Sequence, residues 1–189
     1  IITNITVVGS GVMGRGIAYA GAVGGFRVTI VDVNSAALDS AQTEIEAIME
    51  KGIQYGKLSP EKAEEAKGRL FFLSSLEKAA EEAELIIEAV PEKEQIKRAV
   101  FETIEQYAKA DCYFATNTST MSPTEIASYA NRPEKTIAMH FFNPVHKMPL
   151  VEIVKGLETS DETVAVVKDV AEKMGKETVV INEFPGFVT

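Results

Sequence analysis

The chain lacks several features that mark specialised classes of protein. Its 189 residues include one cysteine and no tryptophan. A single cysteine, Cys112, excludes an internal disulfide and a cysteine metal cluster, and this usage fits a reducing compartment. No apolar run approaches the roughly 20 residues of a membrane span, and no signal-peptide pattern opens the chain. We therefore expect a cytoplasmic protein with no membrane partner and no bound metal.

Positive charge is also scarce. The chain has 19 Lys and Arg residues against 28 Asp and Glu residues, a net charge of −9. A nucleic-acid partner needs a basic face, so we expect none. Single lysines and backbone N–H groups can still bind the phosphates of a small ligand. The hydrophobic content of 46% and the absence of repeats are typical of one soluble globular domain.

The stretch from Ile5 to Gly14 carries the most specific pattern. An apolar run, Ile5–Val8, leads into Gly9-Ser10-Gly11-Val12-Met13-Gly14, a Gly-x-Gly-x-x-Gly turn before a helical segment. In such a unit the first glycine allows the tight turn, the second lets a pyrophosphate approach the backbone, and the third lets helix and strand pack closely. The pattern predicts a dinucleotide site, the alternative being an ordinary strand–turn–helix unit without a nucleotide.

An acidic residue follows at a suitable distance. The next predicted strand, Arg27–Val31, ends at Asp32, close to the offset of about 20 residues from the turn that dinucleotide-binding units show. A carboxylate there can accept both hydroxyls of an adenosine ribose and would repel a 2′-phosphate. Asp32 therefore favours NAD over NADP.

Strand-like and helix-like segments alternate along the rest of the chain. This order predicts an α/β fold of the Rossmann type, a doubly wound and mostly parallel sheet with right-handed crossovers. The charged residues from about 36 to 68 predict a protruding, solvated helical hairpin. Continuous apolarity predicts a buried strand at Leu70–Leu73.

Ligands of such sheets bind beyond the carboxyl ends of the strands. Five segments follow predicted strands and should line one edge: Gly9–Gly14, Asp32, Val90-Pro91-Glu92, Asn117–Ser119 and His140–Asn143. Any one of them is equally well a polar loop. Together they predict a cofactor cleft, with the later loops around the nicotinamide.

Two titratable residues stand out near the far end of this cleft. His140 ends one predicted strand, and Glu152 lies in the next, twelve positions on. An imidazole can take a proton near neutral pH, and a carboxylate on its other nitrogen would set the tautomer. A structural histidine is the alternative. The second histidine, His146, we interpret as a solvated loop residue.

Four segments together resemble the 3-hydroxyacyl-CoA dehydrogenases, most of all the short-chain 3-hydroxybutyryl-CoA branch. They are Asn117-Thr118-Ser119, His140-Phe141-Phe142-Asn143-Pro144-Val145, Leu150-Val151-Glu152 and Phe184-Pro185-Gly186-Phe187. The resemblance implies reversible, NAD-dependent oxidation of a (3S)-hydroxyacyl-CoA to the 3-ketoacyl-CoA, in fatty-acid or butanoate metabolism.

The resemblance also implies roles for single residues. His140 would be the general base, Glu152 its orienting partner, and Ser119 the hydrogen-bond partner of the substrate's C3 oxygen. Lys51 and Lys57 would contact the phosphates of CoA, with solvated surface lysines as the alternative. The implied cofactor contacts are Gly9, Gly11, Val12, Met13, Gly14, Asp32, Ala89, Val90, Glu92, Lys97, Asn117, Ser119 and Asn143.

In one respect the chain departs from this family. Members continue into a second, helical domain that dimerises and closes over the acyl-CoA, whereas this sequence stops at Thr189. We therefore expect residues 1–189 to be the NAD-binding domain, without the C-terminal helical domain, and to bind NAD with little turnover. The intact enzyme would be a homodimer.

Three alternatives stay open at this point. One is a Rossmann-type dehydrogenase of a free hydroxy acid, and another is a non-catalytic NAD-binding module. The third is a fused multifunctional β-oxidation protein of which this chain is one part.

Overall fold

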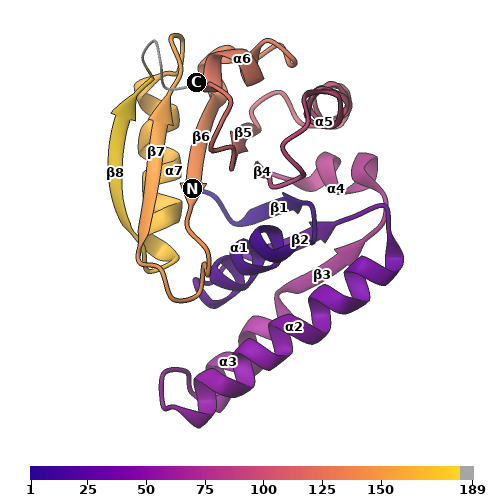
Figure 1. Ribbon diagram of the computed structural model, residues 1–189, viewed down its shortest axis with the longest axis vertical. Helices are drawn as coiled ribbons and strands as arrows, with labels where there is room; N and C mark the ends of the chain where they lie inside the picture. The colour runs from indigo at the N-terminus through magenta and orange to yellow at the C-terminus, as the bar shows by residue number, and fades with distance from the viewer. Residues whose placement is uncertain (184–189) are drawn as a thin grey trace.

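A single eight-stranded sheet forms the centre of the protein. The computed structural model describes residues 1–183. The strand order is β3-β2-β1-β4-β5-β6-β7-β8, and every neighbouring pair is parallel except β6 and β7 (Figure 1). The strands are β1 Asn4–Val8, β2 Arg27–Val31, β3 Leu70–Leu73, β4 Leu85–Glu88, β5 Tyr113–Thr116, β6 Thr136–Phe141, β7 Leu150–Lys155 and β8 Glu177–Asn182. The doubly wound, mostly parallel sheet predicted from the sequence is confirmed.

Polar caps set where several of the helices begin. Asn34 accepts the N–H of Ala37, and Ser59 and Ser122 each accept the N–H three residues on. These bonds satisfy N–H groups that the first turn of a helix leaves free. The helices are α1 Val12–Val23, α2 Ser35–Gln54, α3 Pro60–Gly68, α4 Leu76–Glu82, α5 Glu94–Tyr107, α6 Pro123–Ala127, a 3-10 turn at Pro133–Lys135, and α7 Asp161–Lys173.

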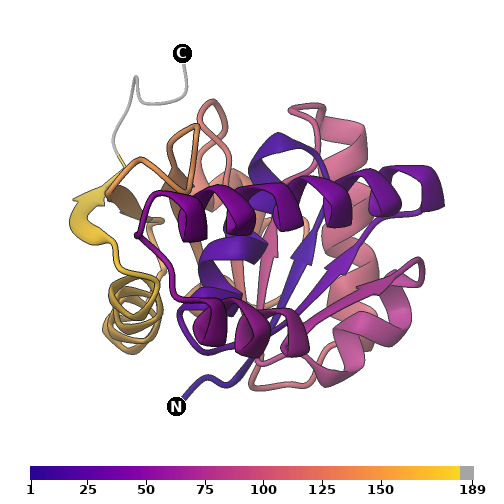
Figure 2. The same cartoon turned by 90° about the horizontal axis from the view of Figure 1, so that it is seen from below.

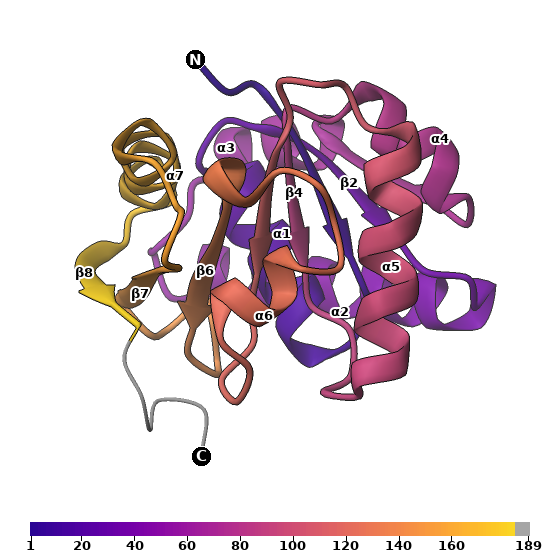
Figure 3. The same cartoon turned by 90° about the horizontal axis from the view of Figure 1, so that it is seen from above.

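Helices cover both faces of the sheet. One face packs against α1, α2, α3 and α7, and the other against α4, α5 and α6 (Figures 2 and 3). Successive side chains of a strand point to opposite faces, so Val7 enters the first core and Val8 the second. Because the central strands are buried on both sides, their sequences are continuous apolar runs rather than alternating ones.

The helical hairpin predicted near residues 36–68 is formed by α2 and α3. Its inner face is packed on the core that contains α1, through Ile45, Met49, Ala63 and Ala66. Its closed end projects past the sheet (Figure 1). Only the outer face is solvated, because the small alanines of α3 let the hairpin lie close against its neighbours.

The strand at Leu70–Leu73 is not buried as its apolar sequence predicts. It is β3, an edge strand of the sheet, and Phe71 and Leu73 are 36% and 39% exposed. The guanidinium of Arg27 lies 4.0 Å from the centre of the Phe71 ring and covers part of it. Apolarity alone does not distinguish a covered central strand from an edge strand.

The Phe184–Phe187 segment, one of the four that carry the family resemblance, lies outside the described residues 1–183. No helix within residues 1–183 has both the length and the apolarity needed to cross a membrane.

The turn between β1 and α1 requires glycine for two different reasons. Gly9 has a φ of +105°, a conformation that side chains with a Cβ rarely adopt. At Gly14 the constraint is space, since a Cβ there would lie 1.8 Å from the carbonyl oxygen of Gly9. A Cβ on Gly11, by contrast, would meet nothing within 4 Å.

This contrast predicts opposite outcomes for two matched substitutions. Gly14→Ala should force α1 away from β1 and lower the free energy of unfolding by about 1–3 kcal/mol or more, as overpacking does. Gly11→Ala should leave it within about 0.5 kcal/mol of the parent value. Urea denaturation of both variants checks this. Equal stabilities would show that the close approach of α1 to the turn carries little energy.

Candidate functional site

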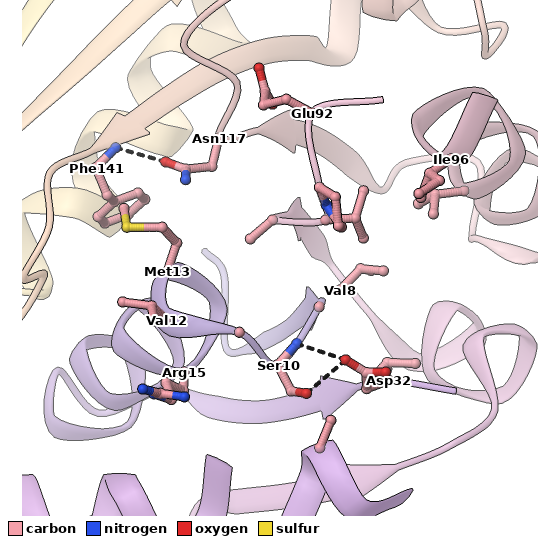
Figure 4. Close-up of a pocket in the computed structure, with 18 of the residues that line it drawn as sticks. Val8, Ser10, Val12, Met13, Arg15, Asp32, Glu92, Ile96, Asn117 and Phe141 are labelled. Carbon is pink, nitrogen blue, oxygen red and sulfur yellow. Dashed lines mark hydrogen bonds between the residues drawn. The ribbon is translucent and has the colours of Figure 1, made fainter. Parts of the chain in front are cut away.

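A cavity of about 910 Å³ opens beyond the carboxyl ends of the strands. It lies where the chain order of the sheet reverses between β1 and β4, the usual ligand crevice of such a fold. The structure brings together there most of the residues that the sequence indicated. They are Gly9, Gly11, Val12, Met13, Asp32, Ala89, Val90, Glu92, Asn117, Ser119, His140 and Asn143. Figure 4 labels Val12, Met13, Asp32, Glu92 and Asn117 among them.

One end of the cavity is suited to an anion. Gly11 caps α1 without any side-chain hydrogen bond, and the first turn of the helix carries no acidic residue. The N–H groups and the positive dipole end of α1 therefore face the cavity without a competing side chain. Such a helix start binds phosphate groups.

Asp32 stands beside this helix start. Its Oδ2 accepts hydrogen bonds from the N–H and the hydroxyl of Ser10 at 3.1 and 2.7 Å, and its Oδ1 accepts the N–H of Asn34 at 3.0 Å (Figure 4). Burial by itself would raise the pKa of this carboxyl, but the three bonds outweigh burial and hold the pKa below its ordinary value. Asp32 is thus an oriented anion. That Ser10 would donate two hydrogen bonds to Asp32 was not apparent from the sequence.

Apolar side chains form the wall near Asp32, and the sequence did not single them out. Val33, which is 88% exposed, lines this part of the cavity together with Leu76, Ile96 and Val100. An apolar wall of this kind suits an aromatic ring system. In the sequence, the one available sign was a valine directly after the acidic residue.

At the opposite end of the cavity His140 pairs with Glu152. The antiparallel register of β6 and β7 sets these residues directly opposite one another, and Nδ1 of His140 lies 2.9 Å from Oε1 of Glu152. A carboxylate only accepts, so the proton is assigned to Nδ1 and Nε2 is left with its lone pair. Since His140 lines the cavity, the pair has the arrangement of a base and its orienter.

Asn117 ties the loop after β5 to β6. Its Oδ1 accepts the N–H of Phe141 at 2.8 Å (Figure 4). This bond holds the loop that carries Ser119 on the same side of the cavity as His140.

Comparison with known proteins agrees with this geometry. Residues 4–184 match the family described as 3-hydroxyacyl-CoA dehydrogenase, NAD binding domain. The chain belongs to this family. NAD is its cofactor, and the free start of α1 and the oriented carboxylate of Asp32 are suited to the pyrophosphate and a ribose of NAD.

Several proteins of this family are similar to the whole chain. A probable 3-hydroxybutyryl-CoA dehydrogenase of Bacillus subtilis is 40% identical over 188 residues, which are 100% of this chain and 65% of that protein. The fatty acid oxidation complex subunit alpha of Psychrobacter arcticus is 42% identical over 187 residues, 99% of this chain and 26% of that protein. The chain therefore spans a quarter to about two thirds of the length of these curated relatives.

Solved structures show the same likeness. The (S)-3-hydroxybutyryl-CoA dehydrogenase of Ralstonia eutropha superposes with a TM-score of 0.95 at 34% identity, over 100% of this chain and 66% of that one. The 3-hydroxybutyryl-CoA dehydrogenase of Escherichia coli gives a TM-score of 0.94 at 35% identity, over 98% of this chain and 39% of that one.

Lys97, one of the implied cofactor contacts, lies behind Glu92 in this structure. Its side chain is 1% exposed and does not line the cavity. Its Nζ lies 2.7 Å from Oε2 of Glu88 and 2.8 Å from Oε1 of Glu92. The amine of Lys97 thus pairs with both carboxylates. Gly14 does not line the cavity either. Its lack of a side chain allows α1 to lie close to the turn after β1.

A second cavity of about 230 Å³ adjoins the first and shares Val12, Arg15 and Asn143 with it. Lys51 and His146 line it as well, whereas Lys57 is exposed and lines neither cavity. His146 is exposed, as predicted, and its ring meets Tyr19 edge-on. Burial, followed by the charges of Lys147, Lys176, Lys51 and Lys57, lowers its pKa. That Arg15 lines both cavities was not apparent from the sequence.

Asp32 should make this chain bind NADH more tightly than NADPH. Asp32→Asn keeps the shape but removes the charge, so we expect the NADH affinity of the chain to fall about tenfold or more, the effect of losing a charged hydrogen bond. NADPH affinity should rise or stay constant. Titration by NADH and NADPH fluorescence measures both, with the exposed Asp39→Asn as the control. An unchanged ratio of the two affinities would contradict the assignment.

Proposed function

We propose that the intact protein catalyses the reversible oxidation of a (3S)-3-hydroxyacyl-CoA to the 3-ketoacyl-CoA with NAD, in fatty-acid or butanoate metabolism. The observation that carries the proposal is the His140–Glu152 pair in the wall of the dinucleotide cavity. A protein that only senses NAD has no need of an oriented base there. The names of the relatives support an acyl-CoA substrate.

The paired residues suggest how the proton is handled. Nε2 of His140 takes the proton of the C3 hydroxyl as the C3–H bond breaks and the carbonyl forms. NAD supplies the acceptor for the hydride, with its two electrons. The Nδ1–H of His140 stays bonded to Glu152, which stabilises the imidazolium that results. In the reverse direction His140 returns the proton to the oxygen.

The neighbouring residues hold the reactants in place. Ser119, exposed on its loop, hydrogen-bonds the C3 oxygen, and Asn143 contacts the carboxamide of the nicotinamide. Glu92 and Lys97, which form an ion pair with one another, would contact the ribose and phosphate side of the cofactor. Met13, Ala89 and Val90 complete the walls around the cofactor.

The hairpin supplies positive charge for CoA. Lys51 lines the second cavity next to Arg15, and the charges of Lys51 and Lys57 both act on His146 there. We propose these lysines as partners of the CoA phosphates. Two cationic side chains, Arg15 and Lys51, line this cavity against one carboxylate, Glu44, and this local excess of positive charge supports the assignment.

The relatives extend well beyond the length of this chain. We propose that a helical segment beyond it closes over the acyl-CoA and forms a homodimer. On this proposal the 189 residues bind NAD but turn over little substrate, and the intact enzyme works in the cytoplasm. Free hydroxy acids are the rival substrates, and a turnover comparison with acyl-CoA thioesters separates the two.

Replacing the base tests the chemistry. In the intact enzyme His140→Gln should lower kcat for acetoacetyl-CoA reduction about 10²–10⁴-fold, the usual contribution of a general acid–base residue. The NADH affinity should stay within about twofold, a change of about 0.4 kcal/mol or less in binding free energy, because the proposed cofactor contacts remain. Near-normal turnover at saturating substrate would exclude His140 as the base.

The second test concerns the chain by itself. We expect NADH to bind to residues 1–189, but NADH oxidation with acetoacetyl-CoA to be at least about 10²-fold slower than in the intact enzyme, because substrate positioning is lost. Assays of NADH oxidation at matched protein concentration compare the 189-residue chain with the intact enzyme. Comparable rates would show that the residues by which the relatives exceed this chain are not needed for turnover.

A further inference from the structure

Ser119 lies between two threonines that bind the same carboxylate. The hydroxyl of Thr118 donates to Oε2 of Glu92 at 2.7 Å, and the hydroxyl of Thr120 donates to the same oxygen. Thr118 also accepts the N–H groups of Thr120 and Met121. The two residues flanking Ser119 are thus anchored to Glu92, while Ser119 is exposed at the cavity.

The other carboxylate oxygen of Glu92, Oε1, forms an ion pair with Lys97. Oε1 lies 2.8 Å from the Nζ of Lys97, whose side chain is 1% exposed. Lys97 is bound in turn by Glu88, which is fully buried at the end of β4. Glu88 also accepts the hydroxyl of Thr116 at 2.6 Å and the N–H of Val90 at 2.9 Å.

These contacts form one continuous network, which we call the Ser119 anchor: Glu88, Lys97, Glu92, Thr116, Thr118 and Thr120. Its buried charges are expensive to desolvate, and such a network is stable only when each group is satisfied. Among the described residues every buried side-chain polar atom has a partner. Burial acts to raise the pKa of Glu92, but hydrogen bonds from Lys97, Thr118 and Thr120 and the charge of Lys97 hold it lower.

We propose that the anchor sets the position of Ser119, and that Lys97 acts on this position through Glu92. Lys97 touches neither the loop nor the cavity, yet it is bonded to the carboxylate that both threonines need. The inference rests on the proposed function only for the contact of Ser119 with the substrate. The anchoring itself is a property of this chain alone.

Two variants separate positioning from a general structural role. Lys97→Met combined with Glu88→Gln removes the buried charges together, so that no lone carboxylate is left buried beside a missing amine. Thr120→Val removes one hydroxyl whose partner is Glu92 and leaves the ion pairs intact. Lys93→Met, an exposed lysine just before α5, and Thr43→Val, an exposed threonine on α2, are the matched controls.

Hydrogen exchange of the 189-residue chain reads the loop directly. In both variants we expect the amides of Thr120 and Met121, which donate to the hydroxyl of Thr118, to exchange at least about tenfold faster. Amides in β2 and α2 should keep their parent rates, and Thr120→Ser should restore the protection of the loop. The two controls should match the parent chain throughout. Unchanged exchange at Thr120 and Met121 in both variants would overturn the proposal.

Binding and turnover complete the test. NADH affinity should change less than about twofold in Thr120→Val, while kcat of the intact enzyme for acetoacetyl-CoA should fall about tenfold and recover in Thr120→Ser. Normal exchange in the loop of the Lys97 variant, whatever its NADH affinity, would overturn the effect of Lys97 on the position of Ser119. If the parent enzyme does not turn over acyl-CoA, the proposed function fails while the exchange result still decides the anchor.

Discussion

The close approach of α1 to the turn after β1 is the constraint on which the rest of the site depends. A Cβ on Gly14 would collide with the carbonyl oxygen of Gly9, so the helix starts directly over the carboxyl end of β1. This places free N–H groups at the crevice and brings the backbone of Ser10 within reach of Asp32. A side chain at Gly14 would displace all of these groups together.

Carboxylates organise the cavity, and in each case other groups determine where their oxygens point. Asp32 is held by Ser10 and Asn34, whereas Glu152 is paired with His140. Glu92 is held by Lys97 and two threonines. Binding sites benefit from such preorganisation, because a side chain already held in place loses little freedom when a ligand arrives. The net charge of −9 is thus compatible with phosphate binding, since the start of α1 carries none of these acids.

Much of this could be predicted from local pattern. The glycine turn, the caps at Asn34, Ser59 and Ser122, and the continuous apolar strands depend on neighbouring residues, so the sequence predicts them well. The order of strands and helices was enough to predict a doubly wound sheet and the edge at which its loops meet. The edge position of β3 was mispredicted, because apolarity does not record whether a second strand lies alongside.

The sequence by itself determined the fold class, the dinucleotide turn and the identity of the histidine and the acids around the cavity. Only the tertiary structure decided how those residues meet. The antiparallel turn from β6 to β7 sets His140 against Glu152, and the packing of α5 buries Lys97 beneath Glu92 rather than at the cavity. The physical reason is that these side-chain contacts depend on strand register and helix packing, and no local pattern of residues encodes either.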